Sequence, residues 1–248
     1  MERLSDKAVL KELINDTGLK VIPGSRAVES VSDAKTEAEK IGYPVMLKAC
    51  AGGGGRGIRL IRNADELDEA YMQAVSEALG AFGDGSMYLE KYIYPARHVE
   101  FQVLADEFHN VVCLGERDCS VQRRNQKLIE ETPSPAVDRN DRLHMIQLIA
   151  DAVKKIGYVG AGTLEFLLDK DNNFWFMEMN VRLQVEHCVT EILTGIDIVK
   201  WQIRIAAGIE FNFTQRDIRL DGSAIECRIN AGNCGRLEML HVAFVVQG

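Results

Sequence analysis

The chain has 248 residues, of which 46% are hydrophobic and 27% charged, as in one large or two small globular domains. Its net charge of −8 argues against extended contact with nucleic acid, so any anion site requires a local concentration of lysine and arginine. No apolar run reaches the roughly 18 residues of a membrane helix, and the first residues carry no secretory segment. Six cysteines without C-x-x-C spacing indicate neither a zinc site nor a disulfide framework, which predicts a reducing, cytoplasmic location.

Helices and strands are predicted to be mixed along the chain, with at least two hairpins. Apolar periodicity and capping residues predict helices at 5–16, 33–41, 63–79, 139–156 and 196–207. Strands or extended segments are predicted at 19–24, 44–49, 58–62, 87–93, 98–105, 111–116, 162–169 and 174–180. This mixture favours an α+β fold with antiparallel sheets over a doubly wound parallel sheet. Three parts are expected: a connecting helix over 1–20, a smaller unit over 21–91, and a larger unit over 92–248 whose tail from 232 is unassigned.

A glycine-rich segment, CAGGGGRG over residues 50–57, lies between two predicted strands. Glycines let the backbone approach an anion and present N–H groups to it. No Lys-Ser/Thr pair and no helix follow, so the segment is neither a Walker P-loop nor a Rossmann fingerprint. A flap that closes over phosphates and a flexible surface hairpin are both compatible with it. Lys48 favours the flap, because a lysine inside an apolar strand needs a partner such as a nucleotide phosphate.

Two carboxylates are predicted to face each other across the second hairpin, whose turn is Lys-Asp-Asn-Asn. If Asp169 pairs with Phe174, Glu165 pairs with Glu178, and their Cβ atoms lie about 4.5–5.5 Å apart. Like charges at that spacing are destabilising unless a cation lies between them. Asn180 shares the face of Glu178, and two carboxylates with an amide oxygen form the all-oxygen ligand set that Mg²⁺ prefers. An exposed strand face with incidental acids is the alternative.

Two further segments gather charge. ERDCSVQRRNQKLIEE, residues 116–131, holds four cations and four acids, which fits either a solvated salt-bridge network or a converging oxyanion pocket. In NVRLQVEH, which follows the second hairpin, Arg182, Gln184 and Glu186 would share one face if the segment is extended. Arginine can hold a planar oxyanion bidentately, and Glu186 beside it is a candidate general base. His187 points the other way and is interpreted as structural.

Taken together and in order, these motifs resemble biotin carboxylase. The resemblance rests on KACAGGGGRG, EKY, PARHVE, ERDCSVQRRNQK, GAGTLEF and EMNVRLQVEH, and it extends from about residue 5 to residue 231. It is shared with the biotin carboxylase subunit of bacterial acetyl-CoA carboxylase and with pyruvate and propionyl-CoA carboxylases, all of them ATP-grasp enzymes. The resemblance implies an ATP-grasp fold with two α+β subdomains and the nucleotide site between them.

The resemblance also implies a reaction. MgATP would activate bicarbonate to carboxyphosphate, and the resulting CO₂ would carboxylate N1 of biotin on a carrier protein, as an ATP-dependent carbon–nitrogen ligase does. In acetyl-CoA carboxylase this step belongs to fatty acid biosynthesis. The implied partners are a biotin carboxyl carrier protein and carboxyltransferase subunits, and a monomer and a dimer are equally open. Mn²⁺ is an alternative to Mg²⁺.

The site residues implied by the resemblance form three groups. Glu165, Glu178 and Asn180 would hold the metal ion. Bicarbonate would meet Lys127, Arg182, Gln184, Val185 through its backbone, and Glu186; among these Glu186 would deprotonate bicarbonate, while Arg182 would also stabilise the biotin enolate and Lys127 would complete the catalytic set. The nucleotide would contact Lys7, Lys48, Gly54, Gly55, Glu90, Lys91, Tyr92, Ile93, His98, Gln122, Asn125, Glu165 and Glu178. Asn125 stands where many relatives have histidine.

Both ends of the chain depart from the resemblance. The family normally carries a further N-terminal domain, and a C-terminal lobe with another arginine that faces biotin. Both are expected to be missing, so MgATP binding is expected to persist while biotin carboxylation is impaired. Two alternatives stay open: a catalytically idle nucleotide-binding or scaffolding fragment, and another bicarbonate-activating ATP-grasp ligase of the carbamoyl-phosphate synthetase kind.

Overall fold

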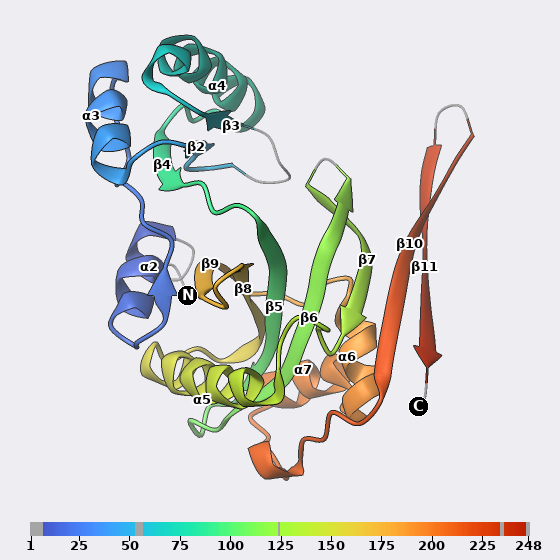
Figure 1. The fold of residues 1–248 in the computed structure, drawn as a ribbon. Helices are drawn as coiled ribbons and strands as arrows, with labels where there is room; N and C mark the ends of the chain where they lie inside the picture. The colour runs from blue at the N-terminus through green and yellow to red at the C-terminus, as the bar shows by residue number, and fades with distance from the viewer. Residues whose placement is uncertain (1–6, 53–56, 124, 234–235, 247–248) are drawn as a thin grey trace. The chain divides into compact units, whose positions relative to one another are not determined.

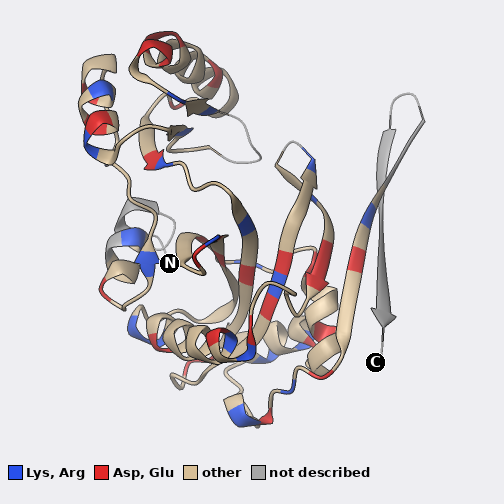
Figure 2. Cartoon of the chain, viewed as in Figure 1, with Lys and Arg blue, Asp and Glu red and all other residues tan. Residues whose placement is uncertain are grey.

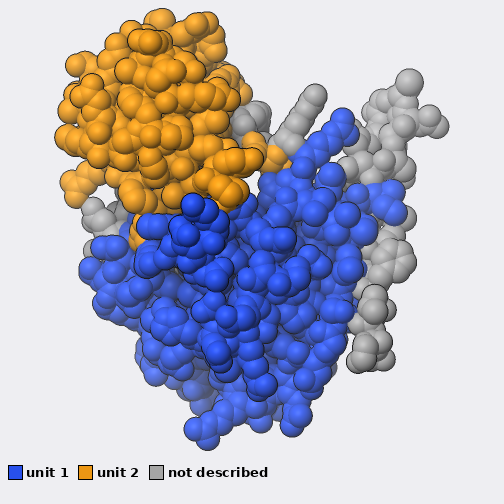
Figure 3. Space-filling model, in the orientation of Figure 1, with its two compact units in different colours: residues 1–20, 96–123, 127–248 blue, residues 21–95, 124–126 orange. Residues whose placement is uncertain are grey.

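The computed structural model describes residues 7–52, 57–123, 125–233 and 236–246, and the chain divides into two compact units (Figures 1 and 3). Unit 1 comprises residues 1–20, 96–123 and 127–248, and unit 2 comprises residues 21–95 and 124–126. No helix in the described part of the chain is long and apolar enough to cross a membrane.

Unit 2 is a three-stranded sheet packed against two helices. Its antiparallel strands have the order β3-β2-β4, with β2 at Val45–Ala49, β3 at Ile58–Ile61 and β4 at Met87–Lys91. The helices are α3 (Val31–Ile41) and α4 (Leu67–Phe82). The side chain of Asn63 caps the 3-10 turn η1 (Ala64–Glu66), so the helix expected from residue 63 begins as a 3-10 turn. Both helices bury alanines against the apolar face of the sheet, which forms the core of this unit.

Unit 1 is built on an eight-stranded sheet with the order β1-β9-β8-β5-β6-β7-β10-β11. Its strands are β1 (Lys20–Val21), β5 (Ala96–Ala105), β6 (Val111–Arg123), β7 (Gln126–Thr132), β8 (Gly160–Asp169), β9 (Phe174–Asn180), β10 (Ser223–Asn233) and β11 (Arg236–Val246). Its helical segments are α2 (Lys7–Asn15), α5 (Arg139–Lys155), α6 (His187–Thr194), α7 (Ile198–Ala206) and the 3-10 turn η2 (Gln215–Asp217). Helix α5 packs on β5 and β6, α6 on β6 and β10, and α7 on β5 and β8.

The side chains of strand β5 point alternately to an apolar face and to a polar face of the sheet. Phe101 points to the apolar face, where its ring meets that of Phe166 edge-on at a centroid distance of 5.8 Å. The alternate residues His98, Glu100 and Gln102 point to the opposite face, as the period of two requires. Strand β5 thereby carries polar side chains into the middle of the sheet on one face only.

A bulge in β6 changes which of its side chains reach that polar face. Phe101 of β5 pairs with Glu116, but Val103 pairs with Cys113, so β6 holds one extra residue there. Gly115 lies in this bulge with φ +88°, a conformation that disfavours residues with a side chain. Val112 and Leu114 pack in the core beside α7, whereas beyond the bulge Arg117 points to the polar face. The charged strand end expected to stop at residue 116 continues to residue 123.

The β8–β9 hairpin contains a second bulge. The expected pairing of Asp169 with Phe174 is wrong, because Phe174 pairs with Leu168. The register then shifts between Glu165 and Phe166, since one extra residue in β9 opposes this step. Glu165 therefore does pair with Glu178, as predicted.

Candidate active site

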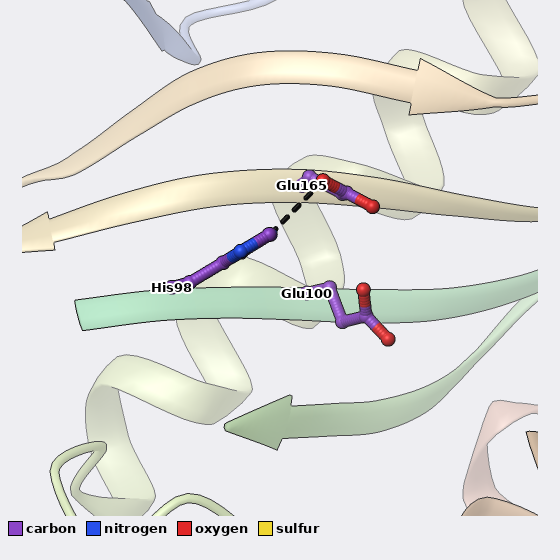
Figure 4. Close-up of side chains that lie close together, drawn as sticks. All are labelled: His98, Glu100 and Glu165. Atoms are coloured by element: carbon purple, nitrogen blue, oxygen red, sulfur yellow. Dashed lines mark hydrogen bonds and ion pairs between the residues drawn. The ribbon is translucent and has the colours of Figure 1, made fainter. Parts of the chain in front are cut away.

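Four charged residues form a row across four neighbouring strands of unit 1. Glu178 of β9 pairs with Glu165 of β8, Glu165 with Glu100 of β5, and Glu100 with Arg117 of β6. Figure 2 shows acidic and basic residues along these strands and along β7 and β10, and Figure 4 shows Glu100 and Glu165 on adjacent strands. Three acids in succession are unfavourable without cations, so the row predicts basic partners beside it.

Lys127 of β7 is the cation that joins these acids. Its Nζ contacts a carboxylate oxygen of Glu100, lies 2.7 Å from Glu186 Oε1 and lies 3.1 Å from Glu165 Oε1. The side chain is only 13% exposed. Burial alone would lower the pKa of Lys127, but Glu100 and Glu165 raise it above its usual range, so the ammonium stays charged. Lys127 of segment 116–131 thus belongs to a buried ion-pair network, not a solvated one, and the oxyanion pocket stays a prediction.

Arg117 is a second, fully buried cation that contacts Glu100. Its guanidinium is fully buried, and its Nε donates to Glu100 Oε1 at 2.6 Å. It also donates to four further side chains, those of Gln102, Thr163, Thr190 and Gln184. Burial alone would raise the pKa of Glu100, but Arg117 and Lys127 hold it below its usual range. Glu100 is thus fixed as a carboxylate between two cations.

His98 orders the other side of Glu165. Its Nε2 lies 2.9 Å from Glu165 Oε2 (dashed in Figure 4), and its Nδ1 lies 2.7 Å from Gln122 Nε2. A neutral ring with the proton on Nε2 satisfies both contacts, because Gln122 then donates to Nδ1. Burial alone would raise the pKa of Glu165, but the hydrogen bond with His98 and the charge of Lys127 hold it well below its usual range.

The segment between β9 and α6 delivers an amide and a carboxylate to the cluster. Gln184 Nε2 donates to Glu165 Oε1 at 2.8 Å, and both Gln184 and Glu186 are buried. The expectation that Arg182 would share an extended face with them is wrong, because residues 181–186 form a loop. Arg182 is exposed and donates to the carbonyl of Leu183 at 3.2 Å. The backbone role expected for Val185, whose side chain is 39% exposed, stays a prediction.

Glu165, Glu178 and Asn180 fit a hard cation by their chemistry. Asn180 Nδ2 donates to Glu165 Oε1 at 2.8 Å, which leaves the amide Oδ1 as the atom suited to a metal ion. Glu165 is held ionised and Glu178 lies opposite it. Ligand atoms of His98, Glu100 and Glu165 also lie within 4.8 Å of one another, so the same acid takes part in a second possible ligand group. The metal assignment of the first set stays a prediction.

The nucleotide residues expected in unit 2 are distributed over its sheet and the segment after it. Lys48 Nζ lies 2.5 Å from Glu90 Oε2, so a buried carboxylate is its partner. Lys91 Nζ donates to the carbonyls of Gly42 and Tyr43. Tyr92 and Ile93 follow the end of β4, and the exposed Asn125 has φ +63° in the turn before β7.

Three expected nucleotide residues give no side-chain geometry. Lys7 begins helix α2, but its side chain lies outside the described part. Gly54 and Gly55 lie outside the described residues altogether.

Three members of the cluster were missed from the sequence: Glu100, Arg117 and Arg228. Glu100 was detectable, because it alternates with His98 and Gln102 along β5. Arg117 was hidden by the bulge before it. Arg228 belongs to β10, and its Nη2 lies 2.7 Å from Glu186 Oε2. The family's further arginine was expected to be missing together with the C-terminal lobe. Arg228 nevertheless lies beside the candidate base, in a part of the chain where no arginine was expected to do so.

Comparison with known proteins identifies the family. The domain family described as "Carbamoyl-phosphate synthase L chain, ATP binding domain" matches residues 6–214. The chain belongs to this family. Within it, the resemblance to biotin carboxylases predicted from the motifs is confirmed. The chain is 54% identical over 232 residues to the 2-oxoglutarate carboxylase small subunit of Hydrogenobacter thermophilus, which covers 93% of this chain and 49% of that protein. It is 53% identical over 229 residues to the biotin carboxylase of Nostoc sp., and this match covers 92% of this chain and 51% of that protein.

Solved structures of this ATP-binding family show the same fold. The biotin carboxylase domain of the H. thermophilus 2-oxoglutarate carboxylase, solved as a dimer with MgADP, ADP and bicarbonate, matches with a TM-score of 0.90 and 55% identity, over 93% of this chain and 51% of that one. The biotin carboxylase of Campylobacter jejuni, solved as a β,γ-ATP complex, matches with a TM-score of 0.90 and 51% identity. This match covers 94% of this chain and 52% of that one. The predicted α+β ATP-grasp fold is confirmed. The chain spans about half the length of the relatives it matches.

Proposed function

We propose that this chain carries the ATP-dependent core of a biotin carboxylase, which activates bicarbonate with MgATP for the carboxylation of carrier-bound biotin. The observation that carries the proposal is the cluster in which Lys127 joins Glu165 to Glu186. In this cluster a carboxylate suited to a metal ion, Glu165, and a candidate base, Glu186, both contact the ammonium of Lys127. The similarity to proteins solved with MgADP and bicarbonate supports the same reading.

Each side chain of the cluster has a role in this reaction. Glu186 takes the proton of bicarbonate, and a bicarbonate oxygen then attacks the γ-phosphorus of ATP, giving carboxyphosphate and ADP. Lys127 and Gln184 hold the anion, because an ammonium and an amide donor at fixed positions stabilise developing negative charge. Carboxyphosphate splits into CO₂ and phosphate, the phosphate takes the proton of biotin N1, and the resulting nitrogen anion of the enolate attacks CO₂. The proposed guanidinium for the biotin enolate is that of Arg228, which contacts the candidate base Glu186, and not that of the exposed Arg182, for which the role was expected.

A divalent metal ion would be held by Glu165, Glu178 and Asn180, and it would neutralise charge on the ATP phosphates. His98 and Gln184 orient Glu165 for that role through their hydrogen bonds to its two carboxylate oxygens. Lys48 of unit 2 is a further proposed phosphate contact, and Glu90 holds its ammonium in place before nucleotide binds. A biotin carboxyl carrier protein and carboxyltransferase subunits are the proposed partners, and a dimer is the state described for the H. thermophilus relative.

The experiment is a titration of MgATP by calorimetry, together with an assay of ATP hydrolysis with and without bicarbonate and biotin. MgATP binding is expected in the native chain and lost in the double variant Glu165→Gln/Glu178→Gln, since the amides remove the charge that holds the metal ion. Glu107→Gln, an exposed acid of the same unit, is the matched control and should bind normally. Unchanged affinity in the double variant would refute the metal assignment. MgATP binding without any bicarbonate-dependent hydrolysis would instead favour an idle nucleotide-binding fragment.

A further inference from the structure

A second buried acid, Glu130 of β7, contacts the arginine that reaches Glu186. The guanidinium of Arg228 lies between the two: its Nη2 is 2.7 Å from Glu186 Oε2, and its Nε is 2.9 Å from Glu130 Oε1. The contact with Glu130 is one of charge rather than an aligned hydrogen bond. Glu130 is fully buried, and the Arg228 side chain is 14% exposed. Glu130 belongs to segment 116–131, but none of the roles given above uses it.

The charge of Glu130 is compensated mainly by Arg228, because its other charged neighbours are acids. In the β7–β10 register Glu130 stands directly opposite Glu226, which is also fully buried and lies 2.7 Å from the Cys188 thiol. Burial raises the pKa of Glu130 to about 7, with Arg228 opposing the rise and Glu186, Glu226 and Glu100 adding to it. The charged form of Glu130 therefore depends on the guanidinium. A guanidinium held at two points also loses the freedom of its long side chain.

We propose that Glu130 is a positioning residue, which clamps the Nε end of Arg228 and so keeps its Nη2 on the candidate base Glu186. The inference rests on the proposed function and deepens it, because it assigns a role behind the bicarbonate site to an acid that touches no substrate. Without Glu130 the guanidinium can rotate away from Glu186, and the base keeps Lys127 on Oε1 but loses the second of its two charged contacts, the one on Oε2.

The test compares two fully buried acids, each paired with an arginine. Glu130→Gln removes the clamp, whereas Glu116→Gln removes the acid that holds Arg142 of α5 at 2.6 Å, outside the cluster. In Glu130→Gln the KM for bicarbonate should rise on the order of tenfold, the scale of one lost charged contact, while the KM for MgATP changes less than about twofold. Glu116→Gln should leave both constants unchanged. Equal changes in the two variants would reduce Glu130 to a structural acid and overturn the proposal.

Two further measurements separate positioning from folding. Glu130→Asp keeps the charge on a shorter side chain, so a KM between those of the native chain and Glu130→Gln is expected; a value above that of Glu130→Gln would contradict the clamp. In the native chain the KM for bicarbonate should rise as pH falls through about 7, because protonated Glu130 no longer holds Arg228, and this step should be absent from Glu130→Gln. A step that persists in the variant assigns the titration to another group and overturns the proposal.

The proposal is also testable without turnover. The ¹⁵N resonance of Arg228 Nε, assigned by its loss in Arg228→Lys, should shift in Glu130→Gln and stay in place in Glu116→Gln, where that of Arg142 shifts instead. If the native chain shows no bicarbonate-dependent hydrolysis, the proposed function fails, yet this comparison still decides whether Glu130 holds Arg228. An Arg228 resonance that is unchanged in Glu130→Gln overturns the clamp.

Discussion

At the residue scale, Lys127 balances the charge of the buried acids. Three carboxylates, those of Glu100, Glu165 and Glu186, converge on its ammonium, and all three are at least 94% shielded from solvent. Arg117, His98 and Arg228 contact Glu100, Glu165 and Glu186 respectively, so no acid depends on Lys127 alone. Removing the ammonium nevertheless leaves three like charges close together in a poorly solvated site, which is costly.

We therefore expect Lys127→Met to lower the free energy of unfolding at pH 7 by about 3–5 kcal/mol, the cost of leaving buried charges without their partner. Urea unfolding measures it. Lys35→Met removes an exposed lysine that contacts Asp68 at 2.7 Å, and it should lower the free energy of unfolding far less, because water screens that pair. Part of the loss in Lys127→Met should be recovered at lower pH, when the acids become protonated. A loss equal to that of the Lys35 variant would show that water already screens the cluster.

Glu130 gives the pH dependence a definite sign. Its pKa is raised to about 7 in the folded chain, against about 4.3 for an unfolded glutamate. Between these values the folded state binds the proton and the unfolded state does not, so the contribution of Glu130 to stability is fully present below about pH 4.3 and is lost as pH rises through 7. The unfolding free energy of the native chain, minus that of Glu130→Gln, should fall across this window. A flat difference would mean that the folded pKa is ordinary.

At the element scale, the bulge at Gly115 decides which face of β6 carries Arg117. Gly115→Ala places a side chain at φ +88°, and the new Cβ would lie 2.9 Å from the Leu220 side chain. Backbone strain alone should cost about 1–2 kcal/mol, seen as a lower urea midpoint. Gly80→Ala is the opposite control: it lies inside α4 with open space around it, so the helix propensity of alanine should raise the midpoint. Equal behaviour of the two variants would show that β6 tolerates another register.

The elements also show how far local pattern predicts the site. The turn chemistry of the hairpin and the register assumed from it predicted the Glu165–Glu178 pair, although the pairing at the turn was one residue off and a bulge in β9 restored it. Period-two reasoning failed after β9, because the chain forms a loop before α6 rather than continuing as a strand. Arg182 therefore faces solvent while Gln184 is buried. Arg228 was missed because strand pairing, not sequence proximity, brings β10 beside β7.

At the scale of the whole molecule, the two units have separate hydrophobic cores and separate sheets. Their mixed helices and antiparallel strands were predictable, since glycine, proline and capping residues mark most of the boundaries. The convergence of Glu100, Glu165 and Glu186 on Lys127 was not, because it depends on register across the eight-stranded sheet. Candidate nucleotide residues occur in both units: Lys48 in unit 2 and Glu165 in unit 1.

Lys48 and Glu165 are each expected to contribute to nucleotide binding. Saturating MgATP should stabilise the native chain by about 2.7 kcal/mol at a concentration of 100 Kd, seen as a rise in Tm. Because Lys48→Met also removes a cation from the buried Glu90, its own Tm will be lower, so the quantity to compare is the rise caused by MgATP. That rise should be strongly reduced both in Lys48→Met and in Glu165→Gln. Lys40→Met, which removes an exposed lysine of α3, should keep the full rise. A full rise in Lys48→Met together with none in Glu165→Gln would show that MgATP recognition does not use Lys48, and the phosphate role of Lys48 would then be wrong.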